Sequence, residues 1–108
     1  MVTAEDVRKL ALSLDGVVEL PHFEKASFRI KNRIFATLSV RTNIVCVKLS
    51  TLDQSVFCAF DKTIIFPVSN KWGHQGWTVI DLKKIKKEML FDALATSYNE
   101  VLRPKLKI

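Results

Sequence analysis

Residues 26–49 read "ASFRIKNRIFATLSVRTNIVCVKL", and this stretch decides the fold. Apolar and polar residues alternate through three successive runs, at 26–31, 34–40 and 44–49. A period of two residues is typical of strands that bury only one face. The short breaks between the runs indicate tight turns, so we expect three antiparallel strands in a meander that is covered on one side.

The alternation assigns the side chains of this meander to two faces. The set expected to point toward the core is Phe28, Ile30, Ala36, Leu38, Val40, Val45, Val47 and Leu49. The set expected to point outward is Ser27, Arg29, Lys31, Phe35, Thr37, Ser39, Cys46 and Lys48.

The chain that follows the meander predicts a short helix and two further strands. Ser50 and Asp53 are typical of a helix start. Apolar residues then recur at a four-residue spacing, at Leu52, Val56 and Phe60. Residues 63–68 and 77–82 read as strands, and residues 69–76, "SNKWGHQG", read as the loop between them.

Amphipathic helices are predicted at both ends of the chain. Thr3 and Asp6 resemble a capping box, and Gly16 is a typical helix stop. The N-terminal helix has one apolar stripe, formed by Val7, Leu10, Ala11 and Leu14. The helix over residues 88–102 has another, formed by Leu90, Leu94, Ser97, Tyr98 and Val101. Between the first helix and the meander we expect a connecting segment, because Pro21 excludes a regular central strand there.

This order of elements predicts an α+β two-layer sandwich. An antiparallel sheet of about five strands would be packed by the N- and C-terminal helices, within a single domain over residues 1–108. The expected core comprises Val7, Leu10, Leu14, Phe28, Ile30, Leu38, Val45, Val47, Leu90, Leu94 and Tyr98.

Composition limits the classes of function. The formal net charge is +6, and the basic excess favours polyanionic partners such as nucleic acid. No run approaches the roughly 18 apolar residues that a membrane span needs. The start of the chain does not resemble a signal peptide, so we expect a cytoplasmic protein. Cys46 and Cys58 lack metal-ligand spacing, so we expect two free thiols. We also expect a monomer.

No catalytic motif is recognisable, and we expect no enzyme, no metal and no cofactor. His74 and His22 could act as bases, but nothing in the sequence places the candidate partners Cys58 and Asp81 within reach of either. An enzyme that relies on His74 or Cys58 stays open as a weaker alternative. The chain also has no nucleophile elbow, zinc-protease motif or phosphate-binding glycine loop.

Several segments together resemble the small bacterial MmcQ/YjbR proteins. They are "LSLDGVVEL", "IFATLSV", "VCVKL", "FPVSNKWGHQGWTVIDL" and the Ser97–Tyr98 pair, and the resemblance extends from about Thr3 to Leu106. It implies a CyaY-like, frataxin-related fold and DNA binding through a winged arrangement. The iron binding known on the frataxin side is not expected here, because the first helix offers only Glu5 and Asp6 beside two cations.

The resemblance and the charge favour sequence-nonspecific binding of double-stranded DNA through phosphate contacts. The run "KKIKK" contributes Lys83, Lys84, Lys86 and Lys87. The predicted hairpin tips contribute Arg33 and Arg41, and the loop contributes Lys71, Trp72 and His74. The run could equally be a solubilising surface.

A second class of function stays open beside DNA binding. The chain could be a protein- or small-ligand-binding module that uses the Trp72 loop and the exposed face of the sheet, since an aromatic ring beside cations can stack on a planar ligand. Trp77 and the glycines near it are expected to serve the fold.

Overall fold

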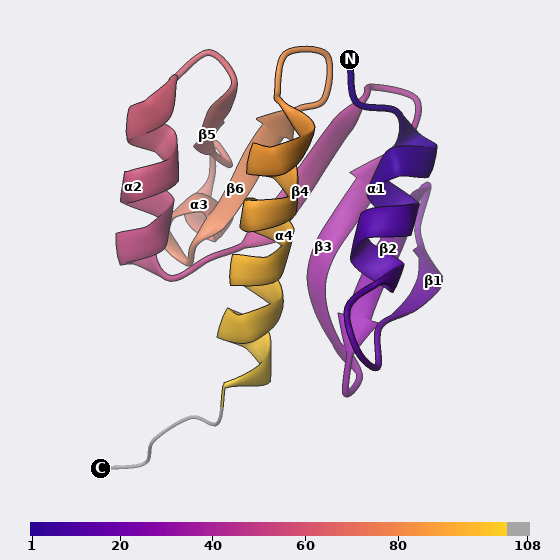
Figure 1. The fold of residues 1–108 in the computed structure, drawn as a ribbon. Helices are drawn as coiled ribbons and strands as arrows, with labels where there is room; N and C mark the ends of the chain where they lie inside the picture. Colours follow the sequence, from indigo (N-terminus) through magenta and orange to yellow (C-terminus); the bar gives the residue numbers. More distant parts are fainter. Residues whose placement is uncertain (104–108) are drawn as a thin grey trace, which may run out of the picture.

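The computed structural model describes residues 1–103 and contains four helices and six strands in an α+β arrangement (Figure 1). In chain order they are α1 (Ala4–Leu12), β1 (Val18–His22), β2 (Lys25–Ile30), β3 (Arg33–Ser39), β4 (Ile44–Lys48), α2 (Thr51–Phe60), β5 (Ile65–Pro67), α3 (Lys71–His74), β6 (Trp77–Asp81) and α4 (Lys87–Leu102).

The strands form one antiparallel sheet in the order β1-β2-β3-β4-β6-β5. Helices α1 and α4 lie side by side against one face of this sheet, and α2 packs at the β5 edge (Figure 1). The predicted two-layer α+β sandwich is therefore confirmed. The opposite face, which we call the open face, carries half-buried side chains such as Thr37, Cys46 and Val79.

The core lies between the sheet and the two long helices. Most of its predicted members are fully buried, while Leu10, Leu14 and Tyr98 are partly buried against it. The predicted capping box is present, since Thr3 Oγ1 accepts the Asp6 N–H at 3.1 Å and Asp6 Oδ2 accepts the Thr3 N–H at 3.0 Å. In the described residues, no helix is long and apolar enough to cross a membrane.

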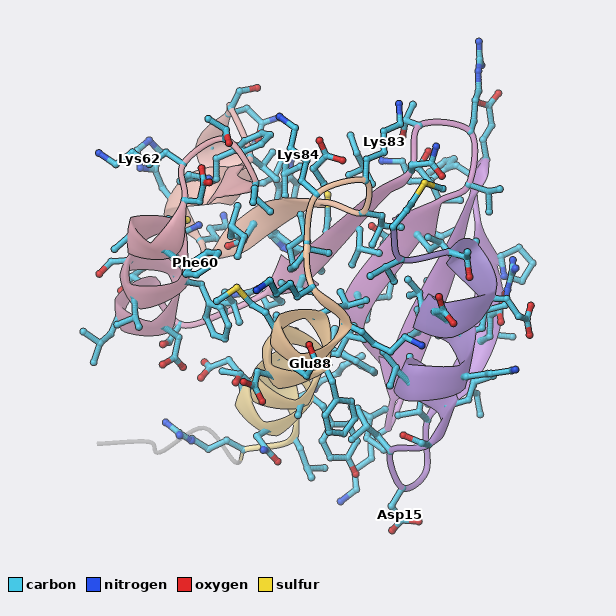
Figure 2. All side chains as sticks on the ribbon, turned by 45° about the horizontal axis from the view of Figure 1, so that its top comes forward. Asp15, Phe60, Lys62, Lys83, Lys84 and Glu88 are labelled. Atoms are coloured by element: carbon cyan, nitrogen blue, oxygen red, sulfur yellow. The ribbon has the colours of Figure 1, made fainter. Side chains whose placement is uncertain are left out.

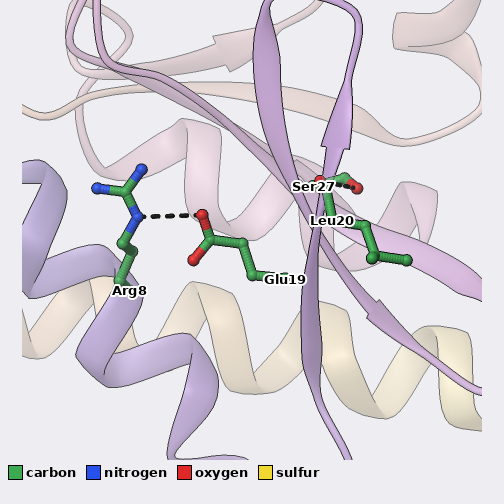
Figure 3. Close-up of polar contacts among 4 residues, drawn as sticks. All are labelled: Arg8, Glu19, Leu20 and Ser27. Carbon is green, nitrogen blue, oxygen red and sulfur yellow. Dashed lines mark hydrogen bonds and ion pairs between the residues drawn. The ribbon is translucent and has the colours of Figure 1, made fainter.

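The segment around Pro21 is an edge strand, β1, so the expectation of a connecting segment is wrong and the sheet has six strands. Proline is tolerated on an edge because its missing N–H faces no partner strand. Figure 3 shows how β1 is held: Arg8 Nε donates to Glu19 Oε2 at 3.1 Å, and Ser27 Oγ donates to the Leu20 carbonyl at 2.8 Å.

Two side chains of the meander differ from the prediction: Phe35 lies on the opposite side of the sheet, and Val40 is exposed instead of buried. A register shift in the β2–β3 pairing places one extra residue, Phe35, between the partners of Phe28 and Arg29, and its ring is fully buried. Such a bulge interrupts the alternation on which the prediction rested. Val40 is 53% exposed because β3 ends at Ser39 and the alternation no longer applies to it.

The Ser97–Tyr98 pair fastens the last helix to the rest of the molecule. Ser97 Oγ donates to the Phe35 carbonyl at 2.6 Å and accepts the Lys48 N–H at 3.0 Å, which joins α4 to β3 and β4. Tyr98 donates its hydroxyl to the Asp15 carbonyl at 2.6 Å. These contacts give both residues a structural role.

Candidate functional site

The nine residues predicted to bind nucleic acid do not form one surface. Arg41, Lys83 and Lys84 lie at the end of the sheet where β4 begins and β6 ends. Arg33 and the segment with Lys71, Trp72 and His74 belong to the opposite end, where β3 begins and β6 begins. Lys86 and Lys87 stand at the start of α4.

Backbone hydrogen bonds bring three loops together at the first of these ends. The Leu82 N–H donates to the Asn43 carbonyl at 3.0 Å, and the Asp81 N–H donates to the Ile64 carbonyl at 2.9 Å. The loops carry four exposed cations, which we call the basic edge: Arg41, Lys62, Lys83 and Lys84. Three of them, Lys62, Lys84 and Lys83, stand along this end of the molecule in Figure 2.

Lys62 is the member that the sequence did not single out. It follows a helix as an isolated lysine, and only the pairing of β5 with β6 brings it to the same end of the sheet as Lys84. A lone cation of this kind carries no local signal that distinguishes it from a solubilising side chain.

Two carboxylates, Asp61 and Asp81, lie on the same loops as the cations and reduce the net positive charge of the basic edge. Hydrogen bonds from the Thr63 hydroxyl and N–H, with a smaller contribution from nearby Lys84, lower the pKa of Asp61. Asp81 Oδ1 accepts the Lys83 N–H at 2.9 Å. The ion pairs found within residues 1–103 are Arg8–Glu19 and Lys87–Asp6, so neither uses a cation of the basic edge.

The run "KKIKK" is divided by its middle residue. Ile85 is only 5% exposed and anchors the segment in the core. Lys83 and Lys84 precede it on the basic edge, whereas Lys86 is the N-cap of α4 and Lys87 pairs with Asp6 at 3.4 Å. Lys87 is therefore already engaged, and the run does not act as a single patch.

The two hairpin tips of the expected winged arrangement point away from each other along the sheet. Arg33 follows a turn in which Lys31 and Asn32 have positive φ angles of 50° and 66°, at the end where β2 meets β3. Arg41 lies in the β3–β4 turn, at the other end of β3. Because β3 separates them, the two arginines cannot belong to one compact contact surface.

The tryptophan segment forms a short helix, α3, where a loop was predicted. Asn70 caps it by accepting the Trp72 N–H at 2.9 Å. A Cβ on Gly73 would lie 2.0 Å from the Val68 carbonyl oxygen, and a Cβ on Gly76, whose φ is +103°, would lie 1.8 Å from the Leu49 carbonyl oxygen. Both glycines are thus needed for close backbone approach, as their predicted role in the fold implies.

Buried hydrogen bonds hold α3 against the sheet. The Gln54 amide nitrogen donates to the Gly73 carbonyl at 2.9 Å, to the Trp77 carbonyl at 3.2 Å and to Thr78 Oγ1 at 3.1 Å. On the outer side Trp72 is 48% exposed, with Lys71 Nζ 5.6 Å from the centroid of its ring.

A cavity of about 360 Å³, which we call the tryptophan pocket, lies on the open face. Its lining residues are His22, Lys25, Ile34, Thr37, Cys46, Val68, Trp72 and Trp77. Both tryptophans therefore line one cavity, although the sequence assigned Trp77 to packing. A second hollow of about 600 Å³ shares Lys25, Cys46 and Val68 with it and includes Arg41.

Three titratable residues line the tryptophan pocket, namely His22, Lys25 and Cys46. Burial raises the pKa of the Cys46 thiol and of the Cys58 thiol, which keeps both neutral near pH 7. His22 lines the pocket, whereas His74 is exposed on α3. Within residues 1–103, no three His, Cys, Asp or Glu side chains are grouped so that they could hold a metal ion.

Comparisons with known proteins agree with the fold. The family model described as YjbR matches residues 12–100. The crystal structure of Deinococcus radiodurans protein DR2400, described by the family-model domain DUF419, is similar with a TM-score of 0.83 at 21% identity, covering 99% of this chain and 83% of that one. A search among curated proteins found no match.

Proposed function

The chain belongs to the YjbR family, and we propose that it is a non-enzymatic cytoplasmic protein that binds double-stranded DNA through phosphate contacts at the basic edge. The observation that carries this proposal is the group of four exposed cations on three loops, joined by backbone hydrogen bonds and without a salt bridge within the described residues. Phosphate contacts need charge at the surface more than they need a defined base-reading geometry.

We expect DNA binding with little sequence preference and with an affinity that depends strongly on salt concentration. Arg41, Lys83 and Lys84 lie on turns and not on a helix, so we do not expect them to read bases as a helix in a major groove would. If two to four cations each meet a phosphate, the affinity should fall with salt at a log–log slope of about −0.9 per contact.

Fluorescence anisotropy of a labelled duplex, titrated with protein at several salt concentrations, tests the proposal. We expect the double variant Lys83→Ala/Lys84→Ala to bind more weakly and to lose about 0.9 of slope for each phosphate contact removed. The matched control is Lys9→Ala/Lys31→Ala, which removes the same charge from exposed lysines outside the basic edge.

The control separates local contacts from overall charge. It should keep most of the affinity, since only distant charge is lost. Equal weakening in both double variants would reject the basic edge, and no binding by the wild type at low salt would reject the DNA function itself.

A second candidate is the binding of a small planar anion or a peptide side chain in the tryptophan pocket. The observation that favours it is one cavity lined by both tryptophans and by Lys25, which supply aromatic surface and positive charge. Such binding should quench tryptophan fluorescence, should weaken less with salt than duplex binding does, and should be lost in Trp72→Ala, while Lys83→Ala/Lys84→Ala leaves it unchanged.

A further inference from the structure

The two hollows on the open face of the sheet form one groove. The tryptophan pocket, of about 360 Å³, and its larger neighbour, of about 600 Å³, meet at three residues that line both: Lys25, Cys46 and Val68. We call the joined hollows the open-face groove. Pockets of about 300–1,000 Å³ are typical of sites for small organic molecules, so each hollow is large enough for a planar ring. The long helices α1 and α4 pack on the opposite face and leave the groove open.

The strand register builds the floor of the groove. One row of paired residues crosses four strands, in the order Thr37, Cys46, Val79 and Phe66. Neighbouring strands lie about 4.8 Å apart, so the row is about 14 Å long. Burial raises the pKa of the Cys46 thiol, which keeps the middle of the row uncharged near pH 7. The floor therefore suits flat, uncharged groups laid side by side.

Each hollow contains an exposed aromatic ring. Phe66 ends the row on β5 and is 38% exposed, and Trp72 on α3 is 48% exposed. Val68, which lines both hollows, lies two residues after Phe66, and its backbone packs against α3 at Gly73. An aromatic ring that is open to solvent leaves its face available for stacking. The groove thus offers two stacking surfaces along one floor.

The charged residues around the groove favour an anionic ligand. Two cations line it, Lys25 and Arg41, together with one carboxylate, Glu24. Lys71 on α3 adds a third cation beside the tryptophan ring. Asp81, at the end of β6, lines neither hollow, and its carboxylate accepts a backbone N–H of the basic edge. Positive charge therefore exceeds negative charge here, as contacts with phosphate require.

We propose that the open-face groove binds an unpaired single strand of DNA, with bases stacked on Trp72 and Phe66 and phosphates at Lys25 and Arg41. Single strands are held without sequence preference where aromatic rings lie beside cations, because every base has a face that stacks. A duplex cannot use these rings, since its bases already stack on one another. An acidic peptide would match the cations but would leave both rings without a stacking partner.

Arg41 links the groove to the basic edge, because it lines the larger hollow and also belongs to the group of four exposed cations. The inference rests on the DNA binding proposed above and extends it. A duplex held at the basic edge would pass an unpaired end past Arg41 into the groove. The preferred substrate class is therefore a junction of double-stranded and single-stranded DNA, and not a blunt duplex.

Fluorescence anisotropy tests the proposal with two labelled probes, a blunt duplex and the same duplex with a single-stranded extension of about ten thymidines. The extended duplex should bind more tightly. Trp72→Ala and Phe66→Ala should each weaken its binding about fivefold or more and leave the blunt duplex unchanged. The matched control is Phe91→Ala, which removes a ring that is 37% exposed on α4, and it should bind both probes like the wild type. Thermal unfolding of each variant identifies any loss of folding separately.

The charge of the groove is tested by Glu24→Gln. This variant removes the carboxylate beside the proposed path of the strand, so the extended duplex should bind about twofold more tightly at low salt while the blunt duplex changes little. Weaker binding of the extended duplex by this variant would overturn the placement of phosphate beside Lys25.

The two probes distinguish the groove from the basic edge. Equal binding of both probes by the wild type would overturn the groove and leave duplex binding in place. A gain that survives both aromatic variants would also overturn it, because extra phosphates alone would then explain the gain. Binding of the extended duplex without binding of the blunt one would reject the duplex function and keep the groove, and no binding of either probe would reject both. Displacement of the extended duplex by polyglutamate as readily as by an unlabelled single strand would replace DNA in the groove with an acidic peptide.

Discussion

At one end of the sheet, backbone hydrogen bonds join three loops and leave the cations of the basic edge in solvent. At the other end, Gly73 and Gly76 allow close backbone contact around α3, and a hydrogen bond from Gln54 holds the helix in place. The first arrangement leaves the side chains free to bind. The second makes the backbone and the buried side chains indispensable. Substitutions at the basic edge should therefore change binding, and substitutions around α3 should change stability.

The largest expected effect belongs to Gly76→Ala. The new Cβ would meet the Leu49 carbonyl oxygen at 1.8 Å in a conformation with φ of +103°, and neither the strand nor the turn can yield easily. We expect a loss of at least about 4 kcal/mol in unfolding free energy, measured by urea denaturation.

Gly16→Ala is the control for that prediction. Its φ of +77° is also strained for alanine, but the nearest atom is the terminal Cδ1 of Ile30 at 2.9 Å, which can move. The loss should be about 1–2 kcal/mol. Equal losses for both variants would show that backbone conformation, and not the contact with Leu49, decides the cost.

Gln54→Leu should have the next largest effect. Gln54 is 9% exposed, and its amide is shared between two backbone carbonyls and a threonine hydroxyl. Leucine would leave these groups without that donor, at a cost of about 2–3 kcal/mol in thermal or urea unfolding. Ser55→Ala, at the neighbouring exposed position, should stay within about 0.5 kcal/mol of the wild type.

Substitution of either hairpin arginine tests the comparison through DNA binding, because neither change should alter the stability of the fold. Arg41→Ala should weaken duplex binding severalfold at low salt, because Arg41 belongs to the basic edge. Arg33→Ala should bind like the wild type, since Arg33 lies at the other end of the sheet. Anisotropy titrations at matched salt measure both. Weaker duplex binding by Arg33→Ala than by Arg41→Ala would show that DNA contacts the end of the sheet that carries α3.

The smallest expected effect is a pH dependence at the basic edge. Hydrogen bonds from Thr63 hold the pKa of Asp61 below its ordinary value of 3.8. A carboxyl group with a lowered pKa stabilises the fold above its unfolded pKa, and this contribution disappears as the pH falls through the folded pKa. Between pH 6 and pH 3, Tm should fall slightly more for the wild type than for Asp61→Asn. Identical profiles of Tm against pH would show that the Asp61 carboxylate does not stabilise the fold.

Local patterns in the sequence predicted most elements of the fold. The capping box, the alternating runs and the stripes of the terminal helices depend on neighbouring residues, and they are present apart from the interruption of the alternation at Phe35. The misses have local causes too: a bulge moved Phe35 to the core face, and Pro21 proved compatible with an edge strand.

The candidate sites were less predictable because they are assembled from distant segments. Lys62 lies at the same end of the sheet as Lys83 and Lys84, and Trp72 lines one cavity with Lys25 and Cys46. These residues are distant in the sequence, and the periodic spacing of apolar residues does not show that they come together. The exposure of Leu52, Val56 and Phe60 was equally hidden, since their spacing predicts a shared helix face but not the direction in which that face points.

By itself, then, the sequence determined the family, the α+β class and the positions of most helices and strands, because these follow from short-range spacing of apolar and polar residues. Only the tertiary structure decided which cations share a surface and which helix face meets solvent. The insertion of β6 between β4 and β5 brings the loops at 61–64 and 81–84 beside the β3–β4 turn. The lengths of β3 and β6 divide the predicted site, because they hold Arg33 and Trp72 at one end of the sheet and Arg41 and Lys83 at the other.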